Sequence, residues 1–245
     1  MCGRYVMEGP ISRMTEYFDA RYTEGESLFK STYNIAPTSV VPVVRINREG
    51  ERVILNHVWG LIPHWAKDAS GSAKLNNARG ETVHEKPSFR TGFKKFRCLI
   101  PASGYYEWQA PPEGTADKKA RKQPFYIYPA TQPYFAMAGV CDHWKDPEGN
   151  LVMSTAIITT EPSAPLAHIH DRMPVMIAPE HWAEWLDPKN QDVEGLRKFI
   201  QSSDEVKSHA VGFGVSNVGK ARLDQVELID QFFGGTNTSS YQGPA

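Results

Sequence analysis

The chain has 245 residues, of which 40% are hydrophobic and 22% are charged, so it can bury one sizeable core or at most two small ones. Its net charge of −1 excludes a generally basic surface, and binding to nucleic acid would need a local basic face. Charged residues interrupt the first twenty positions and no later window approaches a membrane span, so we expect a cytoplasmic protein with no membrane partner.

The cysteines point to reduced thiols. There are three, Cys2, Cys98 and Cys141, and none forms a CxxC pair. This number and spacing support neither a disulfide framework nor a four-cysteine zinc site.

In chain order, the first predicted elements are a helix and a β-hairpin. Ser12 is a candidate N-cap for a short helix whose apolar residues recur at helical spacing, at Met14, Tyr17 and Phe18. The β-branched runs Val40–Ile46 and Arg52–Trp59 flank a turn at 47–50, which predicts a hairpin. Pro42 has no N–H to donate, so we expect an edge or bulged position for the first run.

The middle of the chain predicts more strands between polar segments. Residues 66–74 and 110–123 are polar, and we expect an exposed loop at the first and a mobile loop at the second. Helical spacing of three aromatic residues, Phe89, Phe93 and Phe96, predicts a helix with one aromatic face. Strand composition recurs at 98–100, 105–109, 125–128, 134–141 and 151–159.

The last part predicts a strand at 175–177, helices at 181–186 and 193–201, and a disordered tail at 234–245. Together these elements predict one α+β domain over residues 1–233. Its centre is a mainly antiparallel sheet or open β-barrel with surrounding helices.

Cys2 is the first candidate for chemistry. Removal of a starting methionine requires a small second residue, and cysteine qualifies, so Cys2 could become the terminus. A terminal cysteine carries an amine of pKa ~7.7–8.0 and a thiol of pKa ~8.5, so both nucleophiles are expected to be accessible near neutral pH. The pair can condense with an aldehyde to a Schiff base and then to a thiazolidine ring. The alternative is that Cys2 merely follows the start codon.

Two further segments contain titratable groups. Glu107 lies between aromatic residues in a predicted strand; it either faces apolar surroundings, which would raise its pKa, or points to solvent, and the sequence leaves both open. The cluster 168–174 contains His168, His170, Asp171 and Arg172, which favours the mouth of a cleft. A metal site there is the less favoured alternative, because no other tight ligand cluster is visible, and we expect neither metal nor cofactor.

Basic and aromatic residues could form a groove that holds phosphates and stacks on bases. The candidates are Arg4, Arg79, Arg90, Lys94, Lys95, Arg97 and Arg172, with Trp59, His64, Trp65, Tyr105 and Tyr106. The alternative is that these are ordinary surface cations.

As a set, six short motifs resemble the SOS response-associated peptidase (SRAP) family, whose members act as abasic-site processing proteins. They are Cys2-Gly3-Arg4-Tyr5, Tyr33-Asn34-Ile35-Ala36-Pro37, Trp59-Gly60-Leu61-Ile62-Pro63, Asn77-Ala78-Arg79-Gly80-Glu81-Thr82, Gly104-Tyr105-Tyr106-Glu107-Trp108 and His170-Asp171-Arg172-Met173-Pro174. They run in the family's order over the first 218 residues or so. Gly212 stands where a serine is more usual in the family's closing segment.

The resemblance implies that the substrate is the aldehyde of an abasic site in single-stranded DNA. Cys2 would form a thiazolidine crosslink that shields the lesion. Asn77 would orient the terminal amine or the opened sugar, Glu107 would transfer protons, and His170 would hydrogen-bond the sugar oxygen or a phosphate. The resemblance also implies a monomer that works without a metal and is nucleoid-associated when bound to DNA.

The resemblance further implies a set of DNA-binding residues. Arg4, Arg79 and Arg172 would hold the flanking phosphates, and Trp65 would stack on a base. Asn34, Pro37 and Thr159 complete the predicted contacts.

Other functions stay open at this point. The Schiff base could instead lead to β-elimination, which is a lyase activity. Cys2 could act as an N-terminal peptidase nucleophile, although only Met1 precedes it. The groove could also belong to a non-catalytic reader of single-stranded or modified DNA.

Overall fold

The computed structural model describes residues 2–23, 30–115, 120–217 and 224–232. The predicted tail at 234–245 and part of the predicted loop at 110–123 lie outside these residues. Within them the strands are β1 (Tyr5–Met7), β2 (Arg21–Tyr22), β3 (Thr32–Ile35), β4 (Val40–Ile46), β5 (Arg52–Trp59), β6 (Asn77–Arg79), β7 (Arg97–Ala102), β8 (Gly104–Gln109), β9 (Gln123–Pro129), β10 (Phe135–Lys145), β11 (Leu151–Thr160), β12 (Met173–Pro174) and β13 (Val206–Ala210). The α-helices are α1 (Ile11–Phe18), α2 (Arg90–Lys95), α3 (Trp182–Leu186) and α4 (Val193–Arg197).

Strands β5, β4, β7, β10 and β11 are hydrogen-bonded in that order and form a closed barrel. The neighbouring pairs along this path are antiparallel. The ring closes through a parallel pairing of β5 with β11, which places Val58 opposite Ser154 and Trp59 opposite Thr155. The predicted α+β fold with a mainly antiparallel sheet is confirmed, and the barrel is closed rather than open.

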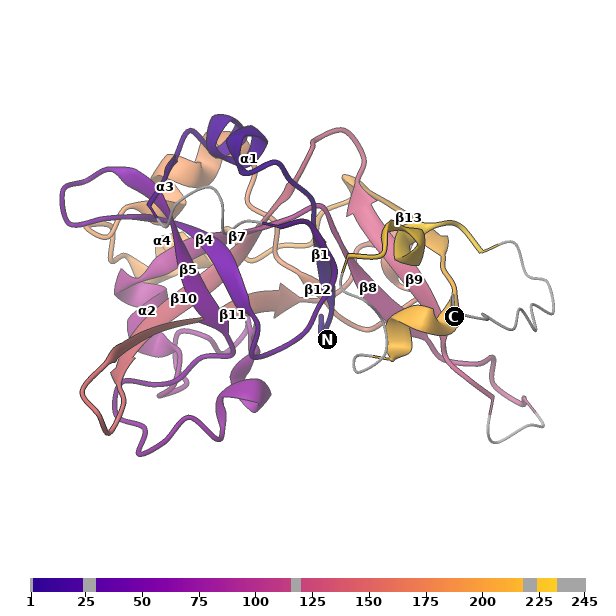
Figure 1. Ribbon diagram of the computed structural model, residues 1–245, viewed down its shortest axis with the longest axis horizontal. Helices are drawn as coiled ribbons and strands as arrows, with labels where there is room; N and C mark the ends of the chain where they lie inside the picture. The colour runs from indigo at the N-terminus through magenta and orange to yellow at the C-terminus, as the bar shows by residue number, and fades with distance from the viewer. Residues whose placement is uncertain (1, 24–29, 116–119, 218–223, 233–245) are drawn as a thin grey trace, which may run out of the picture.

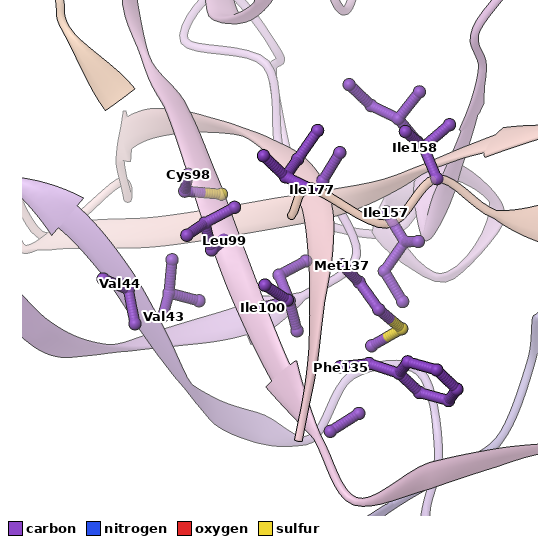
Figure 2. Close-up of a cluster of buried hydrophobic side chains, with 14 of the residues drawn as sticks. Val43, Val44, Cys98, Leu99, Ile100, Phe135, Met137, Ile157, Ile158 and Ile177 are labelled. Atoms are coloured by element: carbon purple, nitrogen blue, oxygen red, sulfur yellow. The ribbon is translucent and has the colours of Figure 1, made fainter. Parts of the chain in front are cut away.

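The barrel is filled by alternate apolar side chains of its own strands. Figure 2 shows part of this core, in which Val43, Ile100, Met137 and Ile157 come from four different barrel strands and are fully buried. Each such side chain contributes about 1.5–3 kcal/mol relative to leaving it exposed. This burial makes the barrel a rigid support for the segments attached to it.

A second sheet has the order β13-β9-β8-β1-β3. In Figure 1, β1 lies between the barrel and the strands β8, β9 and β13. Alternation along the strands divides its side chains between two clusters. Tyr5 and Tyr105 join the core shared with the barrel, whereas Val6 and Tyr106 join a smaller cluster with Val215. The first residues of the chain therefore lie where the two sheets meet.

The predicted N-terminal helix is present, but its cap differs from the prediction. Helix α1 starts at Ile11, with Pro10 in the capping position, so Ser12 lies in the first turn and not at the N-cap. The helix buries Met14 and Phe18. It ends at Asp19, whose φ of 46° is left-handed.

Two other helices are shorter than predicted. Helix α2 ends at Lys95, before Phe96, which is only partly buried. Helix α4 ends at Arg197 and not at 201, because the next backbone bonds run from Phe199 N–H to Leu196 and from Ile200 N–H to Arg197, three residues apart.

Pro42 does not mark an edge strand, so this prediction was wrong. Strand β4 lies between β5 and β7. Pro42 is opposite Asn56 of β5, but the register with β7 contains one pair, Val44 with Leu99, so Pro42 lies outside that ladder. The strand predicted at 175–177 is reduced to one antiparallel bridge, between Met176 and Met137, and the ladder with β11 forms just before it, at Met173–Pro174.

In the described ranges no helix has both the length and the apolar character needed to cross a membrane.

Candidate functional site

Strands β1 and β8 bring the start of the chain beside Glu107. Tyr5 is opposite Tyr105 and Val6 is opposite Gly104 in an antiparallel register. Tyr106 N–H donates to the carbonyl of Arg4 at 3.0 Å, so the pairing extends towards the N-terminus beyond the strand itself. Continuing this register places Gly3 opposite Glu107, so Cys2 follows directly beyond the position that faces this glutamate, whose charge acts on the Cys2 thiol.

The Cys2 thiol is completely buried. Its Sγ lies 3.9 Å from the carbonyl oxygen of Arg4, to which the thiol can donate. Burial raises the pKa of this thiol far above its ordinary value, and the charge of Glu107 raises it further. The expectation of a thiol that ionises near neutral pH was made for Cys2 as the terminus, whereas this chain still carries Met1; here desolvation of the buried sulfur, which is not visible in the sequence, disfavours the thiolate.

Asn77 holds the backbone of Cys2 from the barrel side. It lies at the start of β6, opposite Ile157 of β11 in a parallel pairing. Its Nδ2 donates to the carbonyl oxygen of Cys2 at 2.7 Å. Its Oδ1 is buried and has no hydrogen-bond partner among the described residues. Asn77 thus positions Cys2 and keeps an acceptor for another group.

The side chain of Glu107 faces the interior, which decides between the two orientations left open above. Glu107 is 2% exposed, and burial is the main cause that raises its pKa from 4.5 to about 7. A carboxyl group with this pKa can both donate and accept a proton near neutrality.

His170 is the neighbour of Glu107. Its Nε2 lies 3.6 Å from Oε2 of Glu107. Its Nδ1 accepts from the backbone N–H of Arg172 at 3.1 Å and also lies 2.8 Å from Oδ1 of the exposed Asp171. The first contact requires a free lone pair on Nδ1 and the second requires a proton there. Burial lowers the pKa of His170, which favours the neutral ring with its proton on Nε2, facing Glu107.

Arg172 is held by protein groups. Its guanidinium forms a two-pronged ion pair with Glu81, at 2.6 and 3.0 Å, and donates to the carbonyl oxygen of Thr159 at 2.7 Å. Hydrogen bonding from Arg172 lowers the pKa of the Glu81 carboxyl. Thr159 is itself buried, with its hydroxyl 3.5 Å from the carbonyl oxygen of Ala78. A phosphate bound at Arg172 would therefore share the guanidinium group with the Glu81 carboxylate.

The other predicted DNA-binding residues differ in exposure. Trp65 is 58% exposed and Arg79 is exposed, so both can reach a ligand in solvent. Arg4 and Pro37 are partly buried. Asn34 is completely buried and donates to the carbonyl oxygen of Val215 at 3.2 Å, so it supports the closing segment of the chain from inside.

Arg97 does not belong to a basic groove, and this prediction was wrong. Its guanidinium is buried and donates to five backbone carbonyl groups, those of Phe93, Lys94, Trp185, Asp187 and Asn190. Burial lowers the pKa of this arginine to about 10. Arg97 thus joins the ends of α2 and α3, which is a structural role.

An open pocket of about 600 Å³ adjoins Glu107 on the side of His170. Trp108, Gln109, Lys122, His168 and Asp171 contribute to its lining. Gln109 fixes the facing loop by donating to the carbonyl oxygen of His168 at 2.9 Å. Lys122, Gln109 and Glu81 are not among the site residues predicted from the sequence. The position of Glu81 in a motif with Arg79 was a usable signal, because an acidic side chain among phosphate-binding candidates needs a partner.

Within the part of the chain that the structure describes, no group of three or more His, Cys, Asp or Glu side chains is arranged to hold a metal ion. The side chains that meet at the site are one thiol, one carboxyl, one imidazole and one amide, which come from Cys2, Glu107, His170 and Asn77.

Comparison with known proteins gives consistent matches over almost the whole chain. The model of the family described as SOS response associated peptidase (SRAP) matches residues 1–218. "Abasic site processing protein YoqW" of Bacillus subtilis (strain 168) is 37% identical, over 94% of this chain and 99% of the relative. "Abasic site processing protein HMCES" of Xenopus tropicalis is 31% identical, over 89% of this chain and 75% of the relative.

A solved structure has the same fold. A protein from Bacteroides thetaiotaomicron superposes with a TM-score of 0.81 at 24% identity, and the match covers 94% of this chain and 100% of that one.

Proposed function

Because this chain belongs to the SRAP family, we propose that it processes abasic sites in single-stranded DNA by forming a covalent crosslink through Cys2. The observation that carries this proposal is the convergence of four side chains. Asn77 holds the carbonyl of Cys2, Glu107 is close enough to act on the charge of the thiol, and His170 contacts Glu107.

The proposed reaction begins with the α-amine that Cys2 gains when Met1 is removed. The amine adds to the aldehyde of the ring-opened sugar, and loss of one water gives a protonated Schiff base. The thiol then adds across the C=N bond, which forms the C–S bond of a thiazolidine, and the thiol proton is released. Formation of the protonated Schiff base takes up one proton and ring closure releases one, so the net change is the loss of one water.

Glu107 is the group suited to move these protons. With a pKa of about 7 it is part protonated near neutrality, so it can donate to the departing water and then accept the thiol proton. A base beside the sulfur is needed, because the buried thiol keeps its proton at neutral pH. The Nε2 of His170 lies 3.6 Å from Glu107 and can hydrogen-bond the sugar oxygen or exchange a proton with the carboxyl.

The same Schiff base can also react in a second way. If the thiol does not add, the iminium promotes β-elimination and strand cleavage, which is lyase activity. Ring closure removes the iminium, so the crosslink protects the strand. The positions of Cys2 and Glu107 in one buried site favour ring closure over elimination.

The test uses processed protein and a single-stranded oligonucleotide with one abasic site, followed by a denaturing gel. We expect a denaturation-resistant adduct with the wild type and with Cys98→Ala, a buried cysteine of the barrel core, and none with Cys2→Ala or with a blocked terminus. An adduct that survives both of the last two changes would refute the Cys2 mechanism. Peptide hydrolysis without an adduct would favour a peptidase, and salt-sensitive DNA binding without an adduct would favour a reader.

A further inference from the structure

Two tyrosines on the strands that lead to Cys2 and Glu107 have buried hydroxyls. Tyr5 of β1 and Tyr105 of β8 are directly opposite in the register, and both side chains are 0% exposed. They belong to the same buried cluster as Cys2. Neither hydroxyl has a hydrogen-bond partner among the described residues.

The burial of two unsatisfied hydroxyls requires a physical explanation, because each one lowers the free energy of unfolding by about 1–3 kcal/mol. The packing does not supply it. The ring of Tyr5 lies edge-on to Trp59 at 5.1 Å and that of Tyr105 lies 5.9 Å from Phe135, contacts that a phenylalanine would make equally well.

Neighbouring tyrosines of the same sheet behave differently. Tyr106 donates to the carbonyl oxygen of Tyr33 at 2.8 Å, and Tyr126 donates to that of Ser103 at 3.2 Å. Unpaired hydroxyls in this part of the sheet are therefore found on the face that carries Cys2, at Tyr5 and Tyr105.

Both hydroxyls lie within electrostatic reach of the sulfur. Burial raises the pKa of Tyr5 and of Tyr105 well above the ordinary value, and a negative charge on Cys2 raises both further. Both groups therefore keep their proton at neutral pH and can act only as neutral O–H groups. Such a group donates a hydrogen bond to an anion and lowers the anion's free energy.

The other described groups around the sulfur cannot do this. The carbonyl oxygen of Arg4 only accepts, Asn77 uses its Nδ2 on the Cys2 carbonyl, and the charge of Glu107 disfavours a thiolate. The remaining charged group is the α-amine of Cys2 itself after processing, which is consumed by the aldehyde. A thiolate formed in this desolvated position thus needs other donors.

We propose that Tyr5 and Tyr105 are positioning residues whose hydroxyls donate hydrogen bonds to the Cys2 sulfur as it becomes a thiolate. The inference rests on the proposed function in so far as Cys2 is the attacking nucleophile there. The two hydroxyls offset part of the desolvation of the sulfur and aim its lone pair at the carbon of the Schiff base.

The test measures the thiol without DNA. Processed protein is treated with iodoacetamide over a range of pH, and alkylation of the N-terminal peptide is followed by mass spectrometry, which separates Cys2 from Cys98 and Cys141. We expect Tyr5→Phe and Tyr105→Phe each to make alkylation of Cys2 about tenfold slower at every pH at which the protein stays folded, because loss of one hydrogen bond to the thiolate lowers the thiolate fraction about tenfold. Tyr106→Phe is the matched control and should leave the profile in place, because its hydroxyl belongs to the opposite face.

Removal of a hydroxyl cannot narrow the access to the sulfur, so faster alkylation of the variants would overturn the proposal. An unchanged profile in both folded single variants would overturn it as well. This result is independent of the crosslinking assay. A shifted profile without any DNA adduct would contradict the proposed function but support the role of the tyrosines. An adduct with an unshifted profile would support the proposed function but contradict the role of the tyrosines.

Discussion

Oε2 of Glu107 lies 3.6 Å from Nε2 of His170, and the glutamate is 2% exposed. The carboxyl lies on a strand of the second sheet and the imidazole on a loop after β11, so both the sheet and the barrel have to be in place before this contact exists. The contact links the proton chemistry of the site to the integrity of the fold.

Replacement of Glu107 by Gln should slow both formation and reversal of the proposed crosslink, because the amide cannot transfer a proton in either direction. Loss of a general acid–base group slows a reaction by about 10²–10⁴-fold. Adduct formation and release would be followed by denaturing gel, with Glu49→Gln, an exposed residue of the β4–β5 turn, as the control. Unchanged rates in both directions would remove Glu107 from the mechanism.

The stability of the protein should depend on pH through Glu107. Its pKa is raised from 4.5 to about 7, so between these values the folded protein holds a proton that the unfolded chain has released. The free energy of unfolding should therefore fall as pH rises through this window, by about 3 kcal/mol relative to Glu107→Gln. Urea denaturation of both proteins over this range measures the effect, and a constant difference between them would contradict the prediction.

Replacement of Arg97 by Met should destabilise the fold by about 3 kcal/mol or more, because several buried carbonyl groups lose their donor. Chemical denaturation gives the free energy of unfolding. Arg90→Met is the matched control, since Arg90 starts helix α2, which ends shortly before Arg97 in the chain, but is exposed, and it should change stability little. Equal effects of the two substitutions would show that the carbonyl contacts of Arg97 contribute nothing.

Replacement of Trp65 by Ala should weaken binding to single-stranded DNA without lowering the melting temperature, because its ring is 58% exposed. Stacking on a base contributes about 1–3 kcal/mol, so the Kd should rise about tenfold in a fluorescence anisotropy titration. Leu151→Ala removes a side chain of similar exposure, 59%, and should have no effect on binding. An unaltered Kd for the Trp65 variant would rule out stacking.

Local signals in the sequence were enough to predict many of the strands and helices. Strands β4 and β5 begin and end where predicted, because β-branched runs flank a clear turn. The closed ring was out of reach, because the pairing of Val58 with Ser154 joins segments that are distant in sequence and parallel. The prediction of an edge position for Pro42 was wrong for a related reason. A proline shows that one backbone hydrogen bond is missing, but it does not show where the neighbouring strand ends.

For the site, too, some features could be predicted from the sequence and others could not. The motif around Glu107 identified a candidate residue, but strand alternation alone allowed either face, and burial decided it. Arg97 was assigned to a surface groove because an arginine satisfied by backbone carbonyls has no distinguishing pattern in sequence. The pKa of the Cys2 thiol depends on atoms of β6 and β8 that are far along the chain, so no reading of the first four residues could supply it.

The parallel pairing of β5 with β11 has a consequence for biosynthesis. Until β11 has been made, β2 covers β5 at Val53 and Ile54, but Val58 and Trp59 have no partner on that side and offer an open backbone edge to other nascent chains. His170 follows β11 in the chain, so its contact with Glu107 can form only after every strand of the barrel has been translated.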